Sequence, residues 1–447
     1  MNLGGNRWSA GLRLLAACAA AAATLLPCAT SSAAALKSDF ELGGQWKVNS
    51  TARLMAGLPP MYPGHYSHAQ GDAWKEHSVA MQGGWAQLRA GRVSAMSAWR
   101  NQEISARCPV GKTLLYPFSG PDFFNAYWLF PDCDTFVMFG LEHIGEIPDL
   151  EAMNERDFAR LMSDVRTATA DLFSRNYFIT ENMSRQLYTA QLRGVLPLVM
   201  ISMALSGAEI LRMTPQELDK GSVAGMHAVS GPSAAAPAAG MMPASLPAVP
   251  DESAPKMLSL RKPRGIAIDF RVAGSAEVKR LIYFTVDATD SSLSRYPEFL
   301  SFLRKFAPTT TLLKSASYLL HTRDFSQLRK TLLEVSEFLV QDDSGLPYRT
   351  LVSKGFQMRL HGTYAIPIPP FEGAFQPTLQ AAYQSQNPGP LPFTFGYNFQ
   401  DQRDQRANVM VGKKTSLPRS LVKLAGGDRG VRPAKYAASR YPVRRVR

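Results

Sequence analysis

The sequence predicts a mixed α+β fold of two sheet-plus-helix halves, which a disordered linker rich in Ala, Pro and Ser joins. Three observations lead to this class. Residues 266–272 alternate apolar and polar side chains, as a strand with one wet face does. The runs TLLYPF and TFVMFGL are short and wholly apolar, as buried strands are. Residues 150–173 place apolar side chains three or four positions apart, which is typical of a helix.

The first 35 residues have the three parts of a cleaved signal peptide. Arg7 and Arg13 precede an apolar core, residues 14–26, and small residues up to Ala35 form a cleavage site of the A-x-A type. The core is shorter than the roughly 20 residues of a membrane-spanning helix. A lipidated Cys18 is a weaker alternative, because too few residues separate it from Arg13. We therefore expect a periplasmic or secreted protein with no transmembrane span after cleavage.

Export would leave two cysteines, Cys108 and Cys133, in the mature chain. In an oxidising compartment, two thiols at this spacing favour a disulfide over a metal site. The alternative is a pair of buried free thiols.

Composition divides the mature chain into four parts. Residues 214–256 consist mainly of Ala, Pro, Ser and Gly, which bury too little apolar surface to offset the entropy of ordering, so a disordered linker is predicted. It separates an N-terminal α+β half (36–213) from a C-terminal α+β half (257–400). Residues 401–447 carry 13 Lys and Arg against three Asp, so this predicted disordered tail holds most of the net charge of +13.

The tail suggests one kind of partner. Outside the cytoplasm, a basic segment meets anionic lipid or acidic polymer rather than nucleic acid, so we expect it to bind an anionic envelope surface. Plain solubility is the alternative.

Each half contains further predicted elements. In the N-terminal half we expect a helix over 74–99 that Gly83 and Gly84 would divide, strands at 113–118 and 135–141, and a buried helix at 194–207. In the C-terminal half, the apolar strand 281–286 follows strand 266–272 after a short turn, so the two should pair antiparallel. Helices are expected at 311–325 and 325–339, and a strand at 356–366.

The predicted helix 311–325 carries a candidate catalytic set. Lys314, Ser317 and His321 are spaced at i, i+3 and i+7, so they would share its polar face. A hydroxyl beside an amine and an imidazole can be an activated nucleophile. The order K-x-x-S reverses that of serine–lysine acylases, and any surface helix has a polar face, so a solvated helix is the alternative. Asp342 and Asp343 complete the set, although aspartates in a turn also bind local backbone amides.

A second candidate set surrounds the ends of the two N-terminal strands. The turn Ser119 to Asp122 follows the first strand, with Asp122 expected to cap a short aromatic helix. Strand ends are where α/β proteins place ligands, although an aromatic cluster is more often core. The proposed ligand-binding residues are Ser119, Asp122, Tyr127, Trp128, Glu142 and His143.

Three histidines, His65, His68 and His77, lie close together in sequence but lack the spacing of a known zinc motif. We expect no metal and no cofactor.

These observations favour an exported protein of bacterial type that binds an envelope or extracellular ligand. The alternative is a hydrolase acting on cell-wall, glycan or ester substrates. The hydrolase requires at least three of the candidate polar groups within hydrogen-bond reach of one another in one cleft.

Overall fold

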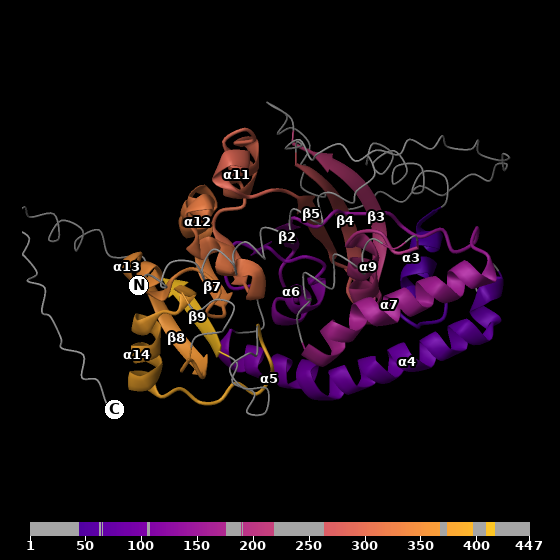
Figure 1. Cartoon of the computed structure of the whole chain (residues 1–447), viewed down its shortest axis with the longest axis horizontal. Coiled ribbons are helices and arrows are strands. Elements are labelled where there is room, and N and C mark those ends of the chain that lie inside the picture. The colour runs from indigo at the N-terminus through magenta and orange to yellow at the C-terminus, as the bar shows by residue number, and fades with distance from the viewer. Residues whose placement is uncertain are drawn as a thin grey trace, which may run out of the picture. The chain divides into compact units, whose positions relative to one another are not determined.

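A nine-stranded mixed sheet forms the centre of the structure (Figure 1). The computed structural model describes residues 44–61, 64, 66–104, 108–175, 189, 191–218, 263–366, 373–396 and 408–415. The chain divides into two units, Met1–Lys414 and Thr415–Arg447, and every described helix and strand belongs to the first. The strand order is β3-β4-β5-β2-β1-β6-β7-β9-β8. The strands are β1 Thr113–Pro117, β2 Thr135–Gly140, β3 Ala208–Glu217, β4 Arg264–Val272, β5 Val278–Thr285, β6 Thr309–Leu313, β7 Ser336–Gln341, β8 Phe356–Gly362 and β9 Asn408–Lys414.

The five central strands are parallel, and antiparallel strands flank them. β5, β2, β1, β6 and β7 run in one direction. β4 pairs antiparallel with β5 and β3 with β4, whereas β9 lies antiparallel between β7 and β8 on the other side. The mixed α/β class and the antiparallel β4–β5 pair are therefore confirmed.

Strands from both predicted halves belong to this single sheet. β1, β2 and most of β3 come from the expected N-terminal half, and β4 to β8 come from the expected C-terminal half. A division into two separate sheet-plus-helix halves is therefore not what the structure shows. β3 extends to Glu217, so the first four residues of the predicted linker lie in a strand, and residues 219–256 lie outside the described part of the chain.

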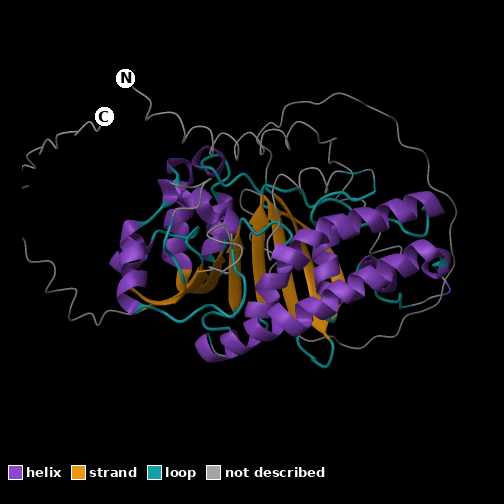
Figure 2. Cartoon of the chain, turned by 60° about the horizontal axis from the view of Figure 1, so that its bottom comes forward, coloured by secondary structure: helices purple, strands orange, loops and turns teal. Residues whose placement is uncertain are grey.

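Helices cover both faces of the sheet (Figures 1 and 2). Those packed on one face are α3 Gly44–Met55, α4 Asp72–Leu88, α5 Ser94–Glu103, α6 Phe123–Leu129, α7 Glu155–Arg175 and α9 Leu196–Leu205. Those packed on the other face are α10 Asp290–Leu293, α11 Glu298–Arg304, α12 Ser326–Val335, α13 Tyr348–Ser353 and α14 Pro377–Gln386. Short turns complete the structure as η2 Ser67–Gln70, η3 Arg89–Val93, η4 Ser315–His321 and η5 Arg323–Phe325.

The apolar runs of β1 and β2 are explained by these two helical layers. Leu114 and Phe136 pack into the core on the α6 face, whereas Leu115 and Val137 pack into the core on the α12 face. A strand buried on both faces has no polar alternation, so a continuous apolar run is expected. The predicted strands at 113–118 and 135–141 are thus confirmed, as is the buried helix at 194–207, which is α9.

The long helix α4 differs from the prediction at its glycines. It continues through Gly83 and Gly84 to Leu88 and passes through the π-helical turn η3 into α5. A Cβ atom at Gly84 would lie 2.9 Å from Cδ2 of Phe173 in α7. The glycine therefore permits close packing of two helices instead of breaking one.

Two other predicted segments are wrong. The expected helix 325–339 ends at Val335, and residues 336–341 form β7. Part of the expected disordered tail, Asn408–Lys414, forms β9 inside the sheet. The rest of the tail beyond Thr415 and the predicted signal peptide lie outside the described residues.

Cys108 and Cys133 form a disulfide, as predicted. Cys108 lies shortly before β1, and Cys133 lies between α6 and β2. The bond therefore joins the approaches to two adjacent strands.

Candidate functional site

The carboxyl ends of the five parallel strands lie at one edge of the sheet, and the chain changes direction there. From β1 the chain moves outward to β2 and then β5, and it returns to place β6 on the other side of β1, followed by β7. In open α/β sheets, ligands bind outside the strand ends at the point between the two outward paths. That point lies here between β1 and β6. We call Asp122, Lys314, Ser315, Asp342 and Asp343, which follow β1, β6 and β7, the polar edge cluster.

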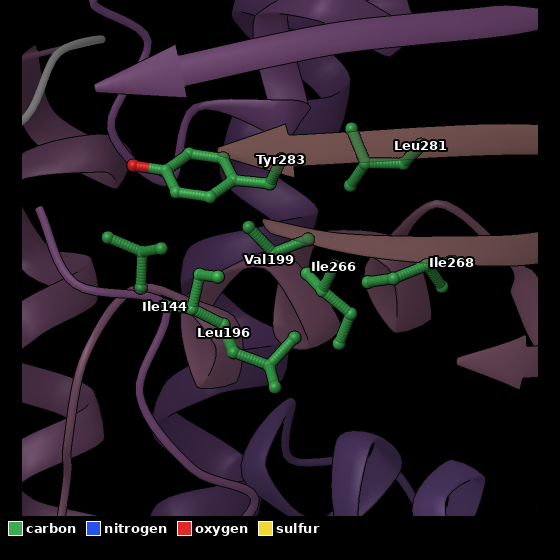
Figure 3. Close-up of a pocket in the computed structure, with 8 residues that line it drawn as sticks. Ile144, Leu196, Val199, Ile266, Ile268, Leu281 and Tyr283 are labelled. Carbon is green, nitrogen blue, oxygen red and sulfur yellow. The ribbon is translucent and has the colours of Figure 1, made fainter. Parts of the chain in front are cut away.

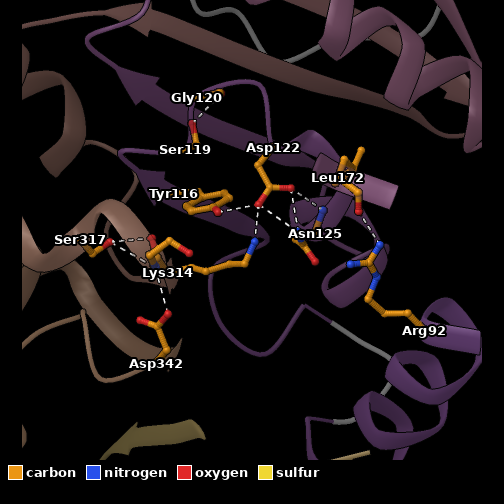
Figure 4. Close-up of polar contacts among 11 residues, drawn as sticks. Arg92, Tyr116, Ser119, Gly120, Asp122, Asn125, Leu172, Lys314, Ser317 and Asp342 are labelled. Carbon is orange, nitrogen blue, oxygen red and sulfur yellow. Dashed lines mark hydrogen bonds and ion pairs between the residues drawn. The ribbon is translucent and has the colours of Figure 1, made fainter. Parts of the chain in front are cut away.

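Asp122 and Lys314 form a buried ion pair at this point (Figure 4). Lys314 Nζ lies 2.9 Å from Asp122 Oδ2, and the two residues are 2% and 3% exposed. Asp122 also caps α6 as predicted, because its Oδ1 accepts a hydrogen bond from the backbone N–H of Asn125 at 3.1 Å. The hydroxyl of Tyr116 donates to Asp122 Oδ2 at 2.8 Å. Groups from β1, α6 and the residue after β6 therefore hold the carboxylate in place before any ligand binds.

Lys314 is surrounded by carboxylates, an aromatic ring and a second cation. Burial lowers the pKa of the Lys314 ammonium, and the Asp122 carboxylate opposes that shift. The ring centre of Phe395 lies 5.7 Å from Nζ. Arg92, from the π-helical turn η3, donates to the carbonyl oxygen of Leu172; burial lowers the pKa of Arg92 to about 10, which Asp122 also opposes. The two cations therefore lie near one buried carboxylate (Figure 4).

Asp342 and Asp343 follow β7 and are also buried. Asp342 Oδ2 accepts a hydrogen bond from the backbone N–H of Ser315 at 3.0 Å, and Oδ1 accepts from the N–H and hydroxyl of Ser344. Burial, together with the neighbouring Asp343 carboxylate, raises the pKa of Asp342 to about 7. Burial raises the pKa of Asp343 as well, although that carboxylate accepts hydrogen bonds from Tyr318 and Asn408. A carboxyl group that titrates near neutrality can act as an acid or a base.

Phe395 and Gly396 pack against two members of the polar edge cluster. Phe395 is 1% exposed, and its ring lies beside the ammonium group of Lys314. Gly396 has φ +64°, and a Cβ atom there would lie 1.9 Å from Asp342 Oδ2. Only glycine allows the backbone to approach the carboxylate this closely in this conformation.

The predicted helix under Lys314, Ser317 and His321 is wrong. Residues 309–313 are strand β6, and the 3₁₀ helix η4 begins after Lys314. Ser317 Oγ accepts from the backbone N–H of Lys314 at 3.1 Å, and His321 Nε2 lies 2.7 Å from the carbonyl oxygen of Gly345. The three side chains therefore do not share a helical face, although Lys314 and the two aspartates do meet at one edge of the sheet.

The second candidate set is dispersed by the structure. Ser119 and Asp122 lie in the predicted turn after β1, where the N–H of Asp122 donates to the carbonyl oxygen of Ser119 at 3.1 Å. Tyr127 and Trp128 pack within the aromatic core around α6. Asp122 is thus the member of this set that enters the polar edge cluster.

Glu142 and His143, the other two members, follow β2. Burial raises the pKa of Glu142, and its carbonyl oxygen accepts a hydrogen bond from Thr285 at 2.9 Å. His143 Nδ1 accepts from the N–H of Gly145 at 3.2 Å. These contacts hold the turn after β2 in place.

The histidines of the N-terminal half are held by carbonyl groups. His68 Nε2 lies 2.8 Å from the carbonyl oxygen of Met153, and its ring stacks on Phe158. His77 Nε2 lies 2.9 Å from the carbonyl oxygen of Met55, and His65 is outside the described residues. Within the described residues, no group of three His, Cys, Asp or Glu is arranged to hold a metal ion.

His77 should make stability depend on pH. It is fully buried, and burial lowers its pKa from 6.5 to about 4. Between these values the unfolded chain binds a proton that the folded chain does not, so stability is lost as the pH falls. We expect this one group to lower the free energy of unfolding by about 2 kcal/mol at pH 5 relative to pH 8. The measurement is urea unfolding of wild type and His77→Gln across this range. A difference between the two proteins that stays constant with pH would contradict the prediction.

A small apolar hollow lies between α9 and the strands β4 and β5 (Figure 3). It has essentially no room for a water molecule, and its lining is Ile144, Val195, Leu196, Val199, Ile266, Ile268, Leu281 and Tyr283. Small-molecule sites usually have roughly 300–1,000 Å³ and several convergent polar groups. We therefore regard this hollow as incomplete core packing.

Sequence reasoning missed Ser315, Tyr116 and Arg92. Tyr116 lies within the predicted strand 113–118 and Arg92 within the predicted helix 74–99, and neither pattern indicates a role in a site. Ser315 follows Lys314 directly, but a helical assignment of this segment turns attention to i+3 and i+7 neighbours instead. If the segment had been assigned to a strand, Lys314 and Ser315 would both have been placed at the end of that strand.

No protein-family model, no curated protein and no solved structure matches this chain. In the portion of the chain that the structure describes, no helix is both long and apolar enough to cross a bilayer.

Proposed function

We propose that the chain is an exported protein of bacterial type that binds an envelope or extracellular ligand at the polar edge cluster. The observation that carries the proposal is the Asp122–Lys314 pair at the point where the two outward paths of the sheet diverge. Burying an ion pair gives little net stability compared with apolar side chains of similar volume. A binding role explains why ionisable groups from three strand ends occupy this position.

Two other features support export. The first 35 residues have the composition of a signal peptide, and the Cys108–Cys133 disulfide suits an oxidising compartment. In the same proposal, the basic residues after Thr415 bind an anionic envelope surface.

A ligand would reach the cluster by replacing the contacts of residues 391–396. Phe395 covers Lys314 through an aromatic contact, and Gly396 packs on Asp342. A ligand with a carboxylate or hydroxyl group for Lys314 and an apolar part for the space of Phe395 would reproduce these contacts.

Thermal unfolding with a panel of soluble peptidoglycan fragments, oligosaccharides and short carboxylic acids and esters tests the proposal. At least one compound should raise the melting temperature of the wild type, and Lys314→Met should weaken its binding roughly ten- to a hundredfold because the cation that binds the ligand is lost. Lys330→Met makes the same chemical change at an exposed position and should not affect binding. A panel without effect, or equal binding by Lys314→Met and wild type, would argue against the proposal.

A hydrolase of cell-wall, glycan or ester substrates is the second candidate. One observation favours it: Asp342, with a pKa of about 7, accepts a hydrogen bond from the backbone N–H of Ser315. A base of this strength held at a residue that carries a hydroxyl group is an arrangement that nucleophilic catalysis uses.

A further inference from the structure

Ser315 has an unusual backbone conformation at the end of a central strand. Lys314 is extended, with φ −156° and ψ 142°, and Ser315 follows with φ +56° before η4 continues the chain. Residues other than glycine rarely occupy this left-handed region, and such strain is often found at functional sites. The strand-to-helix turn therefore presents Ser315 sharply at the end of β6.

The hydroxyl group of Ser315 is also unusual. The residue is 8% exposed, and its Oγ has no hydrogen-bond partner among the residues that the structure describes. Nearby buried serines are engaged, since Ser317 accepts from the N–H of Lys314 and Ser344 donates to Asp342. Buried polar groups in proteins are nearly always satisfied, so an unpaired hydroxyl calls for a ligand or a reaction.

A carboxylate is bonded to the backbone of this residue, although the hydroxyl itself makes no hydrogen bond to it. Asp342 Oδ2 accepts the N–H of Ser315 at 3.0 Å, so the two residues are held together. The titratable groups that face Asp342 are Asp343, which raises its pKa, and Lys314, Tyr318 and Tyr383. With its pKa at about 7, Asp342 is largely ionised above neutral pH and can accept a proton.

We propose that Ser315 Oγ is the nucleophile and Asp342 the base of an acyl transfer from carboxylic esters to water. This inference rests on the polar edge cluster as the binding site and narrows the hydrolase candidate to esters. Rotation about the Cα–Cβ bond of Ser315 brings its hydroxyl to Asp342, and Oγ then attacks the ester carbonyl carbon while its proton moves to Asp342. The bond from the carbonyl carbon to the alcohol oxygen breaks, and Asp342 returns the proton to the departing alkoxide. Water then attacks the acyl-serine, giving the carboxylic acid and free Ser315.

A fluorophosphonate probe and p-nitrophenyl butyrate test this chemistry on the full mature chain. Peptide mass spectrometry should locate the probe on Ser315, and wild type should hydrolyse the ester at a rate that rises with pH through about 7. Ser315→Ala should remove labelling and reduce kcat/KM at least about a hundredfold. Ser353→Ala, which removes an exposed hydroxyl in α13, should leave both unchanged.

Ser315→Gly separates a chemical role from a structural one. Glycine accommodates φ +56° without strain, so this variant should fold at least as stably as the wild type and still fail to label or hydrolyse. Asp342→Asn should flatten the pH profile near 7. Hydrolysis retained by Ser315→Gly, or a wild type that neither labels nor turns over, would overturn the proposal. Ligand-induced stabilisation of Ser315→Gly would then show that the binding function stands without it.

Discussion

Replacing Lys314 with methionine is expected to lower the free energy of unfolding by about 3–5 kcal/mol. Methionine fills nearly the same volume but leaves the Asp122 carboxylate buried without its cation. Tyr116 and the N–H of Asn125 still donate to that carboxylate, but neutral donors replace only part of the lost attraction. Urea unfolding followed by circular dichroism measures the change through the midpoint and the m-value.

Two further variants give this prediction its controls. Lys330→Met makes the same change on the exposed face of α12 and should alter stability by no more than about 0.5 kcal/mol. Adding Asp122→Asn to Lys314→Met removes the unpaired charge and should restore a large part of the loss, because the two sites are coupled. A Lys314→Met protein as stable as Lys330→Met would show that the pair contributes nothing.

Loss of the Cys108–Cys133 disulfide should destabilise the protein by about 3 kcal/mol. The bond closes a loop with a sequence separation of 25, and removing a cross-link of this length enlarges the conformational freedom of the unfolded chain. Cys108→Ala/Cys133→Ala and wild type treated with a reductant should unfold at similar urea concentrations, both below that of the oxidised wild type.

The double alanine variant is also the control for the reductant, because adding the reductant should not change the stability of a protein that has no disulfide. Intact-mass analysis of protein recovered from the periplasm should find the two thiols oxidised. Two free thiols in that material would contradict this prediction.

The sequence predicted most reliably those segments whose apolar pattern fits only one kind of secondary structure. The apolar runs of β1 and β2 and the wholly apolar α9 each match a single burial environment. The alternation in residues 266–272 correctly indicates a strand, but the expected wet face is wrong because Ala267 and Asp269 are buried. The N-cap role of Asp122 also follows from local chemistry alone.

The segment around Lys314 shows why the site itself was harder to predict. Leu312 and Leu313 pack on opposite faces of the sheet, so β6 has a continuous apolar run that also fits a helical repeat. Assigning the run to a helix placed Ser317 and His321 beside Lys314. The actual neighbours, Asp122 and Asp342, lie far away in the sequence, and the order of strands brings them close.

The strands β7 and β9 were also hard to predict. β7 continues an apolar helical repeat, whereas β9 lies in a basic segment. The short run NVMV stands among charged residues, and its partner strands lie about 70 and about 50 positions earlier in the chain, so composition alone indicates a tail. Because β6, β7 and β9 connect β1 with β8, a prediction that lacks these three strands cannot show that all strands belong to a single sheet.

The internal position of β9 determines the order in which the sheet can be completed. β8 has β9 as its neighbour in the sheet, and β9 in turn joins it to β7. During synthesis, β8 therefore waits for more than forty later residues before it gains a hydrogen-bonded partner. A chain that stops short of Asn408 lacks β9, and β8 then has no strand to pair with. The edge of β7 is left open to pairing with other molecules.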